Sequence, residues 1–196
     1  GVGVRSVRSS ANGRGSTAGR LRDYAAFHVR ALAATLGPKR YRGIVFLTTP
    51  PLLSFVGWLG RVFRGRRYAI WSMDLHPEAE VAAGMLKRHS PLGHLLFWAN
   101  GRGYRSADFV IALGTYMRER ILASGARVSP ARVHIVPVWV DGDEISPTPR
   151  AGNPLGGELG LEGKFGVAYI GNAGRAHDFA HCLEAMRRLK ENPDIY

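Results

Sequence analysis

Apolar residues along the chain form two alternating kinds of stretch. Short continuous apolar runs bounded by turn-forming residues predict buried strands at residues 43–49, 67–73, 107–113 and 132–137. Stretches in which apolar residues recur every three or four positions predict helices at 20–36, 52–63, 92–102 and 115–124. Strands that alternate with helices form a parallel sheet, and the continuous apolar runs indicate that both faces of that sheet are covered.

The pattern changes after the fourth predicted strand. Residues 138–163 lack periodicity and contain several prolines, glycines and acids, which predicts an interdomain linker. Residues 164–171 then predict another strand and 177–191 another helix. We therefore expect a Rossmann-like α/β domain at 1–137 and the first βα unit of a second such domain at 164–196. The chain starts with Gly rather than Met and ends inside an expected strand, so we interpret it as part of a longer protein.

Composition narrows the class of protein only slightly. The 196 residues are 45% hydrophobic and 21% charged, as in ordinary globular proteins. The single cysteine, Cys182, excludes an internal disulfide and a Cys-rich metal site. No secretory leader is recognisable at the start of the chain.

The charge is distributed unevenly. Residues 1–73 contain 13 Lys and Arg but one acid, Asp23, and so account for the whole net charge of +12. Such a field attracts phosphates, nucleic acid or anionic membrane. The chain has no recognisable nucleic-acid-binding motif, so we do not expect a nucleic-acid partner. The alternative is a solvated basic face without a specific partner.

One segment combines the apolar and basic features. The helix predicted at 52–63 is followed at once by basic residues, as in helices that lie on anionic lipid. The alternative is a core helix with a charged end. The expected membrane or anion contacts are Arg61, Arg64, Arg66 and Arg67.

A Gly-rich turn joins the strand predicted at 164–171 to the next helix. Glycines allow close backbone approach, and the free N–H groups that start a helix favour a diphosphate. The turn lacks the dinucleotide and NTPase patterns, and an ordinary strand-to-helix turn is the alternative. The candidate phosphate-binding residues are Gly171, Asn172, Gly174, Arg175, His177 and Asp178.

Polar ionisable residues also follow the strand predicted at 67–73. Asp74, His76 and Glu78 lie where open α/β sheets bind ligands, at the carboxyl end of a strand. A histidine there can contact a phosphate or a sugar hydroxyl, and a carboxylate can orient it. No third ligand accompanies the Asp-X-His pair, so we expect no metal. The alternative is the start of a helix with Glu78 and Glu80 in its first turn.

Several of these segments occur together in a known order. Segments 47–51, 73–78, 107–114 and 133–141 are followed by 169–172, Gly174 and the pair His177–Asp178. On these residues the chain, from about residue 20 onward, resembles the glycosyltransferases of family 4, a group with the GT-B fold.

The resemblance implies two Rossmann-like domains that face each other across a cleft. The N-terminal domain would bind the acceptor, and the C-terminal domain a nucleotide-sugar donor, which is a substrate, so no cofactor is expected. Transfer would retain the anomeric configuration without a metal. Members commonly act on cell-envelope or lipid-linked glycan acceptors, so we expect a cytoplasmic protein bound peripherally to the inner face of the plasma membrane.

The resemblance assigns roles to particular residues. Gly171, Asn172 and Gly174 match the turn under the donor diphosphate, with Arg175, His177 and Asp178 nearby. Asp74 and His76 match the segment that projects into the cleft and are the candidate catalytic residues. The family's first strand and its Glu-x7-Glu segment are not found in the sequence, so we expect this chain alone to be inactive. The alternative function is a non-enzymatic basic α/β module that binds anionic membrane or nucleic acid.

Overall fold

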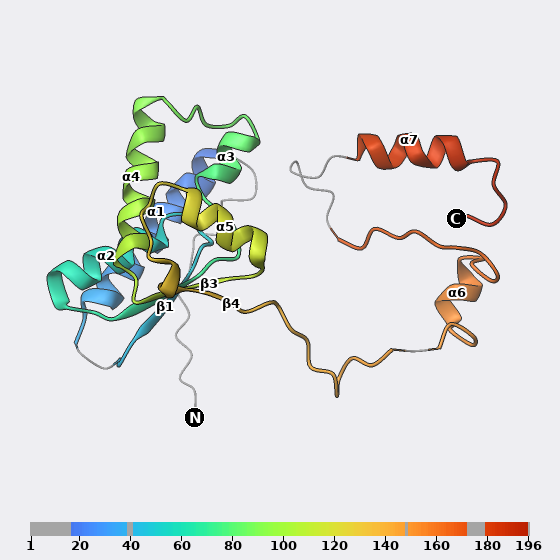
Figure 1. Ribbon diagram of the computed structural model, residues 1–196, viewed down its shortest axis with the longest axis horizontal. Coiled ribbons are helices and arrows are strands. Elements are labelled where there is room, and N and C mark those ends of the chain that lie inside the picture. Colours follow the sequence, from blue (N-terminus) through green and yellow to red (C-terminus); the bar gives the residue numbers. More distant parts are fainter. Residues whose placement is uncertain (1–16, 39–40, 148, 172–178, 196) are drawn as a thin grey trace. The chain divides into compact units, whose positions relative to one another are not determined.

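The computed structural model describes residues 17–38, 41–147, 149–171 and 179–195. The chain divides into two compact units, Gly1–Val138 and Trp139–Tyr196. Figure 1 labels the elements of both units and colours them along the sequence. The first unit contains a sheet with its helices, and the described part of the second contains two short helices.

Four parallel strands form the centre of the first unit, and their spatial order follows the chain. Phe46 lies beside Ile70, Ile70 beside Val110 and Val110 beside Val133, so apolar side chains form a row across the sheet. The prediction of an α/β fold with an all-parallel, Rossmann-like sheet is confirmed. The strands are β1 (Ile44–Leu47), β2 (Tyr68–Trp71), β3 (Phe109–Ala112) and β4 (Val133–Ile135).

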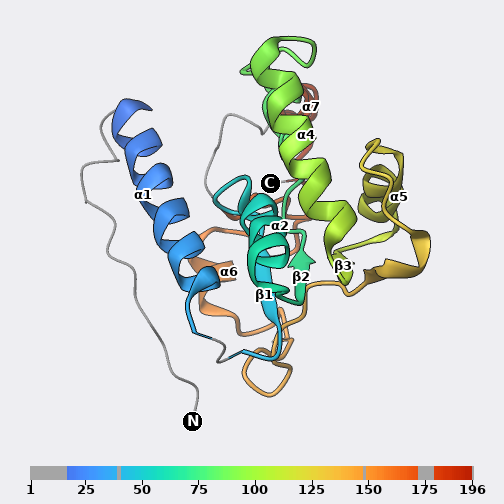
Figure 2. The same cartoon turned by 90° about the vertical axis from the view of Figure 1, so that its left-hand side faces the viewer.

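Helices connect these strands along one face of the sheet. Connections between parallel strands are almost always right-handed, so a sheet whose order follows the chain carries its connecting helices on the same side. Figure 2 shows α2 between α1 and α4 on the near side of the sheet, and α2 packs against both neighbours. The helices are α1 (Thr17–Leu36), α2 (Leu53–Arg64), α3 (Glu78–Ala82), α4 (Pro91–Ser106) and α5 (Thr115–Ala123), and a 3₁₀ turn (Pro130–Arg132) precedes β4.

Every strand and helix that the sequence predicted before residue 138 is present. The short helix α3 is the alternative expected after Asp74, with Glu78 and Glu80 in its first turn. Its neighbour α4 starts with an ordinary cap, because the Ser90 hydroxyl accepts the Gly93 N–H.

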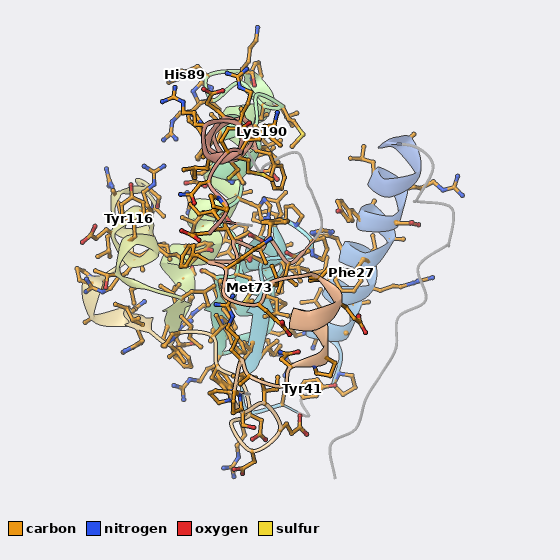
Figure 3. All side chains as sticks on the ribbon, turned by 90° about the vertical axis from the view of Figure 1, so that its right-hand side faces the viewer. Phe27, Tyr41, Met73, His89, Tyr116 and Lys190 are labelled. Atoms are coloured by element: carbon orange, nitrogen blue, oxygen red, sulfur yellow. The ribbon has the colours of Figure 1, made fainter. Side chains whose placement is uncertain are left out.

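The core lies between the sheet and this helical layer. Tyr68 is 2% exposed, and its hydroxyl donates to the Gly103 carbonyl at 2.6 Å. Burial raises the pKa of Tyr68 well above its ordinary value, so the phenol remains a donor. Phe27, labelled in Figure 3, packs from α1 against the same core. The largest fully buried side chains otherwise include Ile70, Val110 and Ile121.

The close packing of α2 on α4 depends on Gly103. A Cβ atom at this position would lie 2.5 Å from the backbone carbonyl carbon and oxygen of Ser54. Backbone atoms cannot move aside as a flexible side chain can, so the crossing requires glycine.

The opposite face of the sheet is covered only in part by the described residues, where Ala69 is 3% exposed but its neighbours on that face are not buried, so the prediction of two covered faces is not met there. Val45, Leu47 and Phe109, which point to that face, are 57%, 46% and 43% exposed. The physical reason is the strand order, which places α2, α4 and α5 on one side. A continuous apolar run in a strand therefore does not indicate which segment covers the second face of the sheet.

The second unit differs from its prediction in two places. Residues 164–171 do not form a strand, because only one bridge, between Phe165 and Ile195, pairs that segment. Tyr169 meets the Phe179 ring at a centroid distance of 4.9 Å, but Val167 and Ile170 are 72% and 94% exposed, so most of the apolar run is not packed within the described residues. The segment expected to be an irregular linker contains the short helix α6 (Pro154–Glu158), which Asn153 caps. The predicted second helix is present as α7 (Ala180–Leu189).

Candidate functional site

The loops that follow β1 and β2 are tied together at the carboxyl end of the sheet. The Thr48 hydroxyl oxygen accepts the backbone N–H groups of Met73 and Asp74 at 3.1 and 3.0 Å. The Thr49 hydroxyl donates to Asp74 Oδ2 at 3.4 Å, a long contact that leaves the carboxylate exposed. The backbone at Asp74 is therefore fixed while its carboxylate remains accessible to a ligand.

His76 is oriented by a carboxylate that is four residues further along the chain. Its Nδ1 lies 2.6 Å from Glu80 Oε1, and both side chains are largely buried. Because a carboxylate accepts, Nδ1 carries the proton and a neutral ring presents Nε2 as an acceptor. The second oxygen, Glu80 Oε2, is buried and has no hydrogen-bond partner within the described residues.

A chain of hydrogen bonds connects this loop to the helices behind it. Asn100 on α4 donates from Nδ2 to the His76 carbonyl at 2.7 Å. Its Oδ1 accepts the Ser54 hydroxyl of α2, also at 2.7 Å. The position of His76 is thus fixed both by its side chain and by its backbone. The peptide bond that follows, His76–Pro77, is cis.

A cavity of about 150 Å³ lies beside His76, between α3, α4 and α5. Tyr104 contributes a hydroxyl 2.9 Å from Ser72 Oγ, and burial raises the pKa of Tyr104 to about 12, so this hydroxyl is neutral. Two arginines and several hydrogen-bonding groups make the cavity suitable for a polar, hydroxyl-rich or anionic ligand. Its polar lining residues include His76, Glu78, Arg88, Asn100, Tyr104 and Arg120.

The two predicted catalytic residues lie in different surroundings. His76 lines the cavity, whereas Asp74 does not and instead contacts Thr49 beyond the end of β1. The edge of the sheet thus presents an oriented imidazole and an exposed carboxylate that separate contacts hold in place. Within the described residues, no group of three or more His, Cys, Asp or Glu side chains is arranged to hold a metal ion.

The sequence of this unit carries a family signature over the same region. Residues 1–139 match the family model described as glycosyl transferase 4-like domain. The chain belongs to this family. The match includes all four strands and the loops that hold Asp74 and His76.

This glycosyl transferase 4-like domain also resembles a curated protein. It is 28% identical over 166 residues to the probable glycosyltransferase WbjE of Pseudomonas aeruginosa. The aligned region covers 84% of this chain and 41% of that protein. The chain therefore spans about two fifths of the length of the relative it matches.

The predicted donor-side residues of the glycosyl transferase 4-like chain lie mostly outside the described structure. Asn172, Gly174, Arg175, His177 and Asp178 are not among the described residues. Gly171 is described, and its φ of 151° lies in the region that favours glycine. The helix α7 that follows begins at Ala180, after the predicted start.

The four predicted anion-contacting arginines divide into two pairs. Arg66 is 4% exposed, and its guanidinium donates to the carbonyl oxygens of Thr35 and Gly37 at the end of α1. Arg61 donates to the Ser106 carbonyl and to Asp108. The remaining two, Arg64 and Arg67, are exposed. Burial thus excludes Arg66 from a membrane surface and gives it a structural role, which corrects that part of the prediction.

Asp108 organises the amino end of the sheet. Burial alone would raise its pKa, but the Tyr68 N–H and the Arg61 guanidinium outweigh it and hold the pKa of this carboxyl below its ordinary value. Arg61 Nη1 is 3.1 Å from Asp108 Oδ2, and Arg67 Nε is 3.8 Å from Oδ1. The segment of family resemblance that contains Asp108 therefore has a structural role in this domain.

Sequence reasoning missed three residues that fix the site, namely Glu80, Asn100 and Thr48. The i, i+4 rule for helices gave no signal for the first, because His76 precedes α3, which begins at Glu78. The contacts that Asn100 and Thr48 make with residues 73–76 bridge 24 to 26 residues along the chain. No local pattern indicates contacts of that kind.

Proposed function

We propose that the protein transfers a glycosyl group from a nucleotide-sugar donor to a cell-envelope or lipid-linked glycan acceptor. The family match over residues 1–139 carries this proposal, because that region contains the oriented His76 and the exposed Asp74. The cavity beside His76, with its arginines, neutral phenol and amide, supports a hydroxyl-rich ligand on this side. The finer expectations of a retaining, metal-independent reaction belong to the same proposal.

In this proposal His76 and Asp74 hold hydroxyl groups of the sugar or the acceptor. Nε2 of His76 accepts a hydrogen bond from a hydroxyl, while Glu80 keeps the proton on Nδ1. Asp74 accepts from a second hydroxyl. During transfer the bond from the anomeric carbon to the diphosphate oxygen breaks and a bond to the acceptor oxygen forms. The acceptor proton leaves with the departing diphosphate or with a nearby base.

The donor diphosphate is proposed to bind at the turn formed by Gly171, Asn172 and Gly174. Backbone N–H groups and Arg175 would stabilise the negative charge that grows on the leaving phosphate. His177 and Asp178 lie next in the sequence and are proposed as further donor contacts.

Calorimetry of the intact protein with a panel of nucleotide sugars tests the donor assignment. We expect one sugar nucleotide to bind, and Gly174→Asp to weaken its affinity by about tenfold or more through repulsion of the diphosphate. Gly142→Asp is the matched control, since a side chain at Gly142 meets open space. Absence of binding by every nucleotide sugar, with the fold intact, would contradict the proposal.

The acceptor side has a separate test. Asp74→Asn and His76→Gln should lower the rate of glycosyl transfer by a larger factor than they weaken the binding of the donor. Donor affinity and the rate are measured on the same protein preparation. Equal loss of both quantities would show that these side chains do not act on the acceptor side.

A further inference from the structure

The helices that cover the sheet carry apolar side chains on their outer sides as well as toward the core. On α2 the residues opposite the buried positions are Phe55, Trp58 and Val62. On α4 the corresponding positions are Leu95, Trp98 and Arg102, with the same i, i+3, i+7 spacing. We call these six residues the α2–α4 outer face.

Three aromatic rings join the two helices on this face. The Trp98 ring centroid lies 5.8 Å from that of Phe55 and 6.0 Å from that of Trp58. The Phe55 and Trp58 centroids are 5.1 Å apart. Trp98 is 47% exposed, and both Val62 and Leu95 are 57% exposed. The rings therefore form one continuous apolar surface that reaches solvent. Figure 2 shows the two helices side by side.

The charge around this face is mainly positive, although Glu78 of α3 lines a cavity together with Trp98, Arg88, Arg102 and Arg105. Neither α2 nor α4 contains an acidic residue, and acids are absent from the whole of residues 24–73 and 81–107. The guanidinium carbon of Arg102 lies 5.5 Å from the Trp98 ring centroid, so a cation borders the aromatic cluster directly. A surface helix usually carries polar residues on its outer side, so this face is unusual for one exposed to water alone.

These features identify the occupant of the face. Tryptophan favours the boundary between water and lipid, because its ring is largely apolar and its indole N–H remains hydrated. Arginine beside the rings and the lack of acids on α2 and α4 themselves favour a negatively charged surface. A second copy of this chain would bring the same basic helices together, and their charges would repel.

We propose that the α2–α4 outer face binds the surface of an anionic lipid bilayer, with Trp58 and Trp98 inserted at the headgroup level. Of the four arginines expected to contact an anionic surface, Arg61 and Arg66 are engaged within the unit, whereas Arg64 and Arg67 remain exposed. The inference extends the proposed function, since a lipid-linked acceptor lies at such a surface. Its test uses no nucleotide sugar, so a failure here is separate from a failure of the transferase proposal. Among the described residues, no helix has the length and apolar character needed to cross a bilayer.

Co-sedimentation with lipid vesicles tests the proposal. The whole chain is mixed with vesicles of phosphatidylcholine alone or of equimolar phosphatidylcholine and phosphatidylglycerol. We expect binding to the anionic vesicles that weakens with salt, and little binding to the neutral ones. Brominated lipid should quench the tryptophan fluorescence of the bound protein. Failure to bind anionic vesicles, or binding without quenching, would overturn the proposal.

Variants separate the outer face from general basic charge. Trp98→Gln should weaken binding to anionic vesicles by about tenfold, because an exposed ring loses its place at the interface. Trp139→Gln is the matched control, as Trp139 is 71% exposed in the other unit and should not change binding. Arg102→Gln should give a smaller loss that disappears at high salt. Circular dichroism confirms that each variant is folded.

Two outcomes would assign the face to something else. Equal loss of vesicle binding by Trp98→Gln and Trp139→Gln would contradict a specific surface. Dimerisation in the absence of lipid, abolished by Trp98→Gln, would show that a second copy covers the face. Sedimentation equilibrium distinguishes that case.

Discussion

The two ends of the four-stranded sheet hold their polar groups in opposite ways. At the amino end, Asp108 accepts hydrogen bonds from the Tyr68 N–H and from Arg61, and Arg61 also reaches the Ser106 carbonyl. At the carboxyl end, Asp74 has one long hydrogen bond and remains exposed. The same residue type is thus used for stability at one end and left available at the other.

This difference follows from the physics of buried and exposed charge. A carboxylate that is removed from water needs several donors, and Asp108 has them from β2 and α2. A carboxylate that remains in water needs none, so Asp74 retains its capacity to accept from a ligand. Substitutions at the two ends should therefore separate stability from function.

The largest expected effect comes from closing the space between α2 and α4. Gly103→Ala should destabilise the first unit by about 3 kcal/mol, because the new Cβ would meet the Ser54 backbone at 2.5 Å. Gly101→Ala, in the same helix, is the control, since its Cβ would find ordinary contacts at 3.7 Å or more. Urea unfolding measures both. Similar stability of the two variants would show that α4 can shift and that Gly103 is not required.

The contrast between the two ends of the sheet is tested by replacing the aspartate at each end with alanine. Asp108→Ala should lower the free energy of unfolding by about 2 kcal/mol, because the Tyr68 N–H and Arg61 lose their acceptor. The partial exposure of Arg61 limits the share that the ion pair contributes. Asp74→Ala should change stability by less than about 0.5 kcal/mol. A larger loss of stability in Asp74→Ala than in Asp108→Ala would contradict the contrast between the two ends of the sheet.

How far the sequence could predict these two ends depends on the range of the contacts. Strands and helices before residue 138 followed from local periodicity, which is a property of neighbouring residues. The burial of Arg66 depends on carbonyls of Thr35 and Gly37, about thirty positions earlier, and no local pattern distinguishes it from exposed Arg64. The strand predicted at 164–171 failed for a related reason, because a strand needs a neighbour as well as an apolar run.

Only part of the candidate site could be predicted from local sequence patterns. The positions of Asp74 and His76 after β2 follow from the rule that ligands bind beyond the carboxyl ends of parallel strands. The partner of His76 did not follow, because Glu80 meets it only when α3 begins directly after Pro77. The role of Asp108 also depends on Arg61, which is distant in sequence.

Acid titration should affect the amino end more than the carboxyl end. The folded-state pKa of Asp108 is lowered, so its contribution to stability is complete above the ordinary pKa of about 3.9 and is lost as the pH falls through the lower folded value. Unfolding free energies measured from about pH 5 downward should fall less steeply in Asp108→Asn than in the wild type. Asp74→Asn is the control and should retain the wild-type slope. Identical slopes in the wild type and Asp108→Asn would contradict the assignment.

The smallest expected effect concerns the orientation of one imidazole at the carboxyl end. Glu80→Gln replaces an obligate acceptor by an amide that can also donate, so His76 should lose about 1 kcal/mol of its preference for a proton on Nδ1. Nitrogen-15 NMR of the imidazole ring reports the tautomer directly. Glu78→Gln is the matched control, because Glu78 lines the same cavity and shares the first turn of α3 but is not the hydrogen-bond partner of His76. A tautomer that responds equally to both substitutions would mean that the general charge of the cavity, rather than the Glu80 contact, orients the ring.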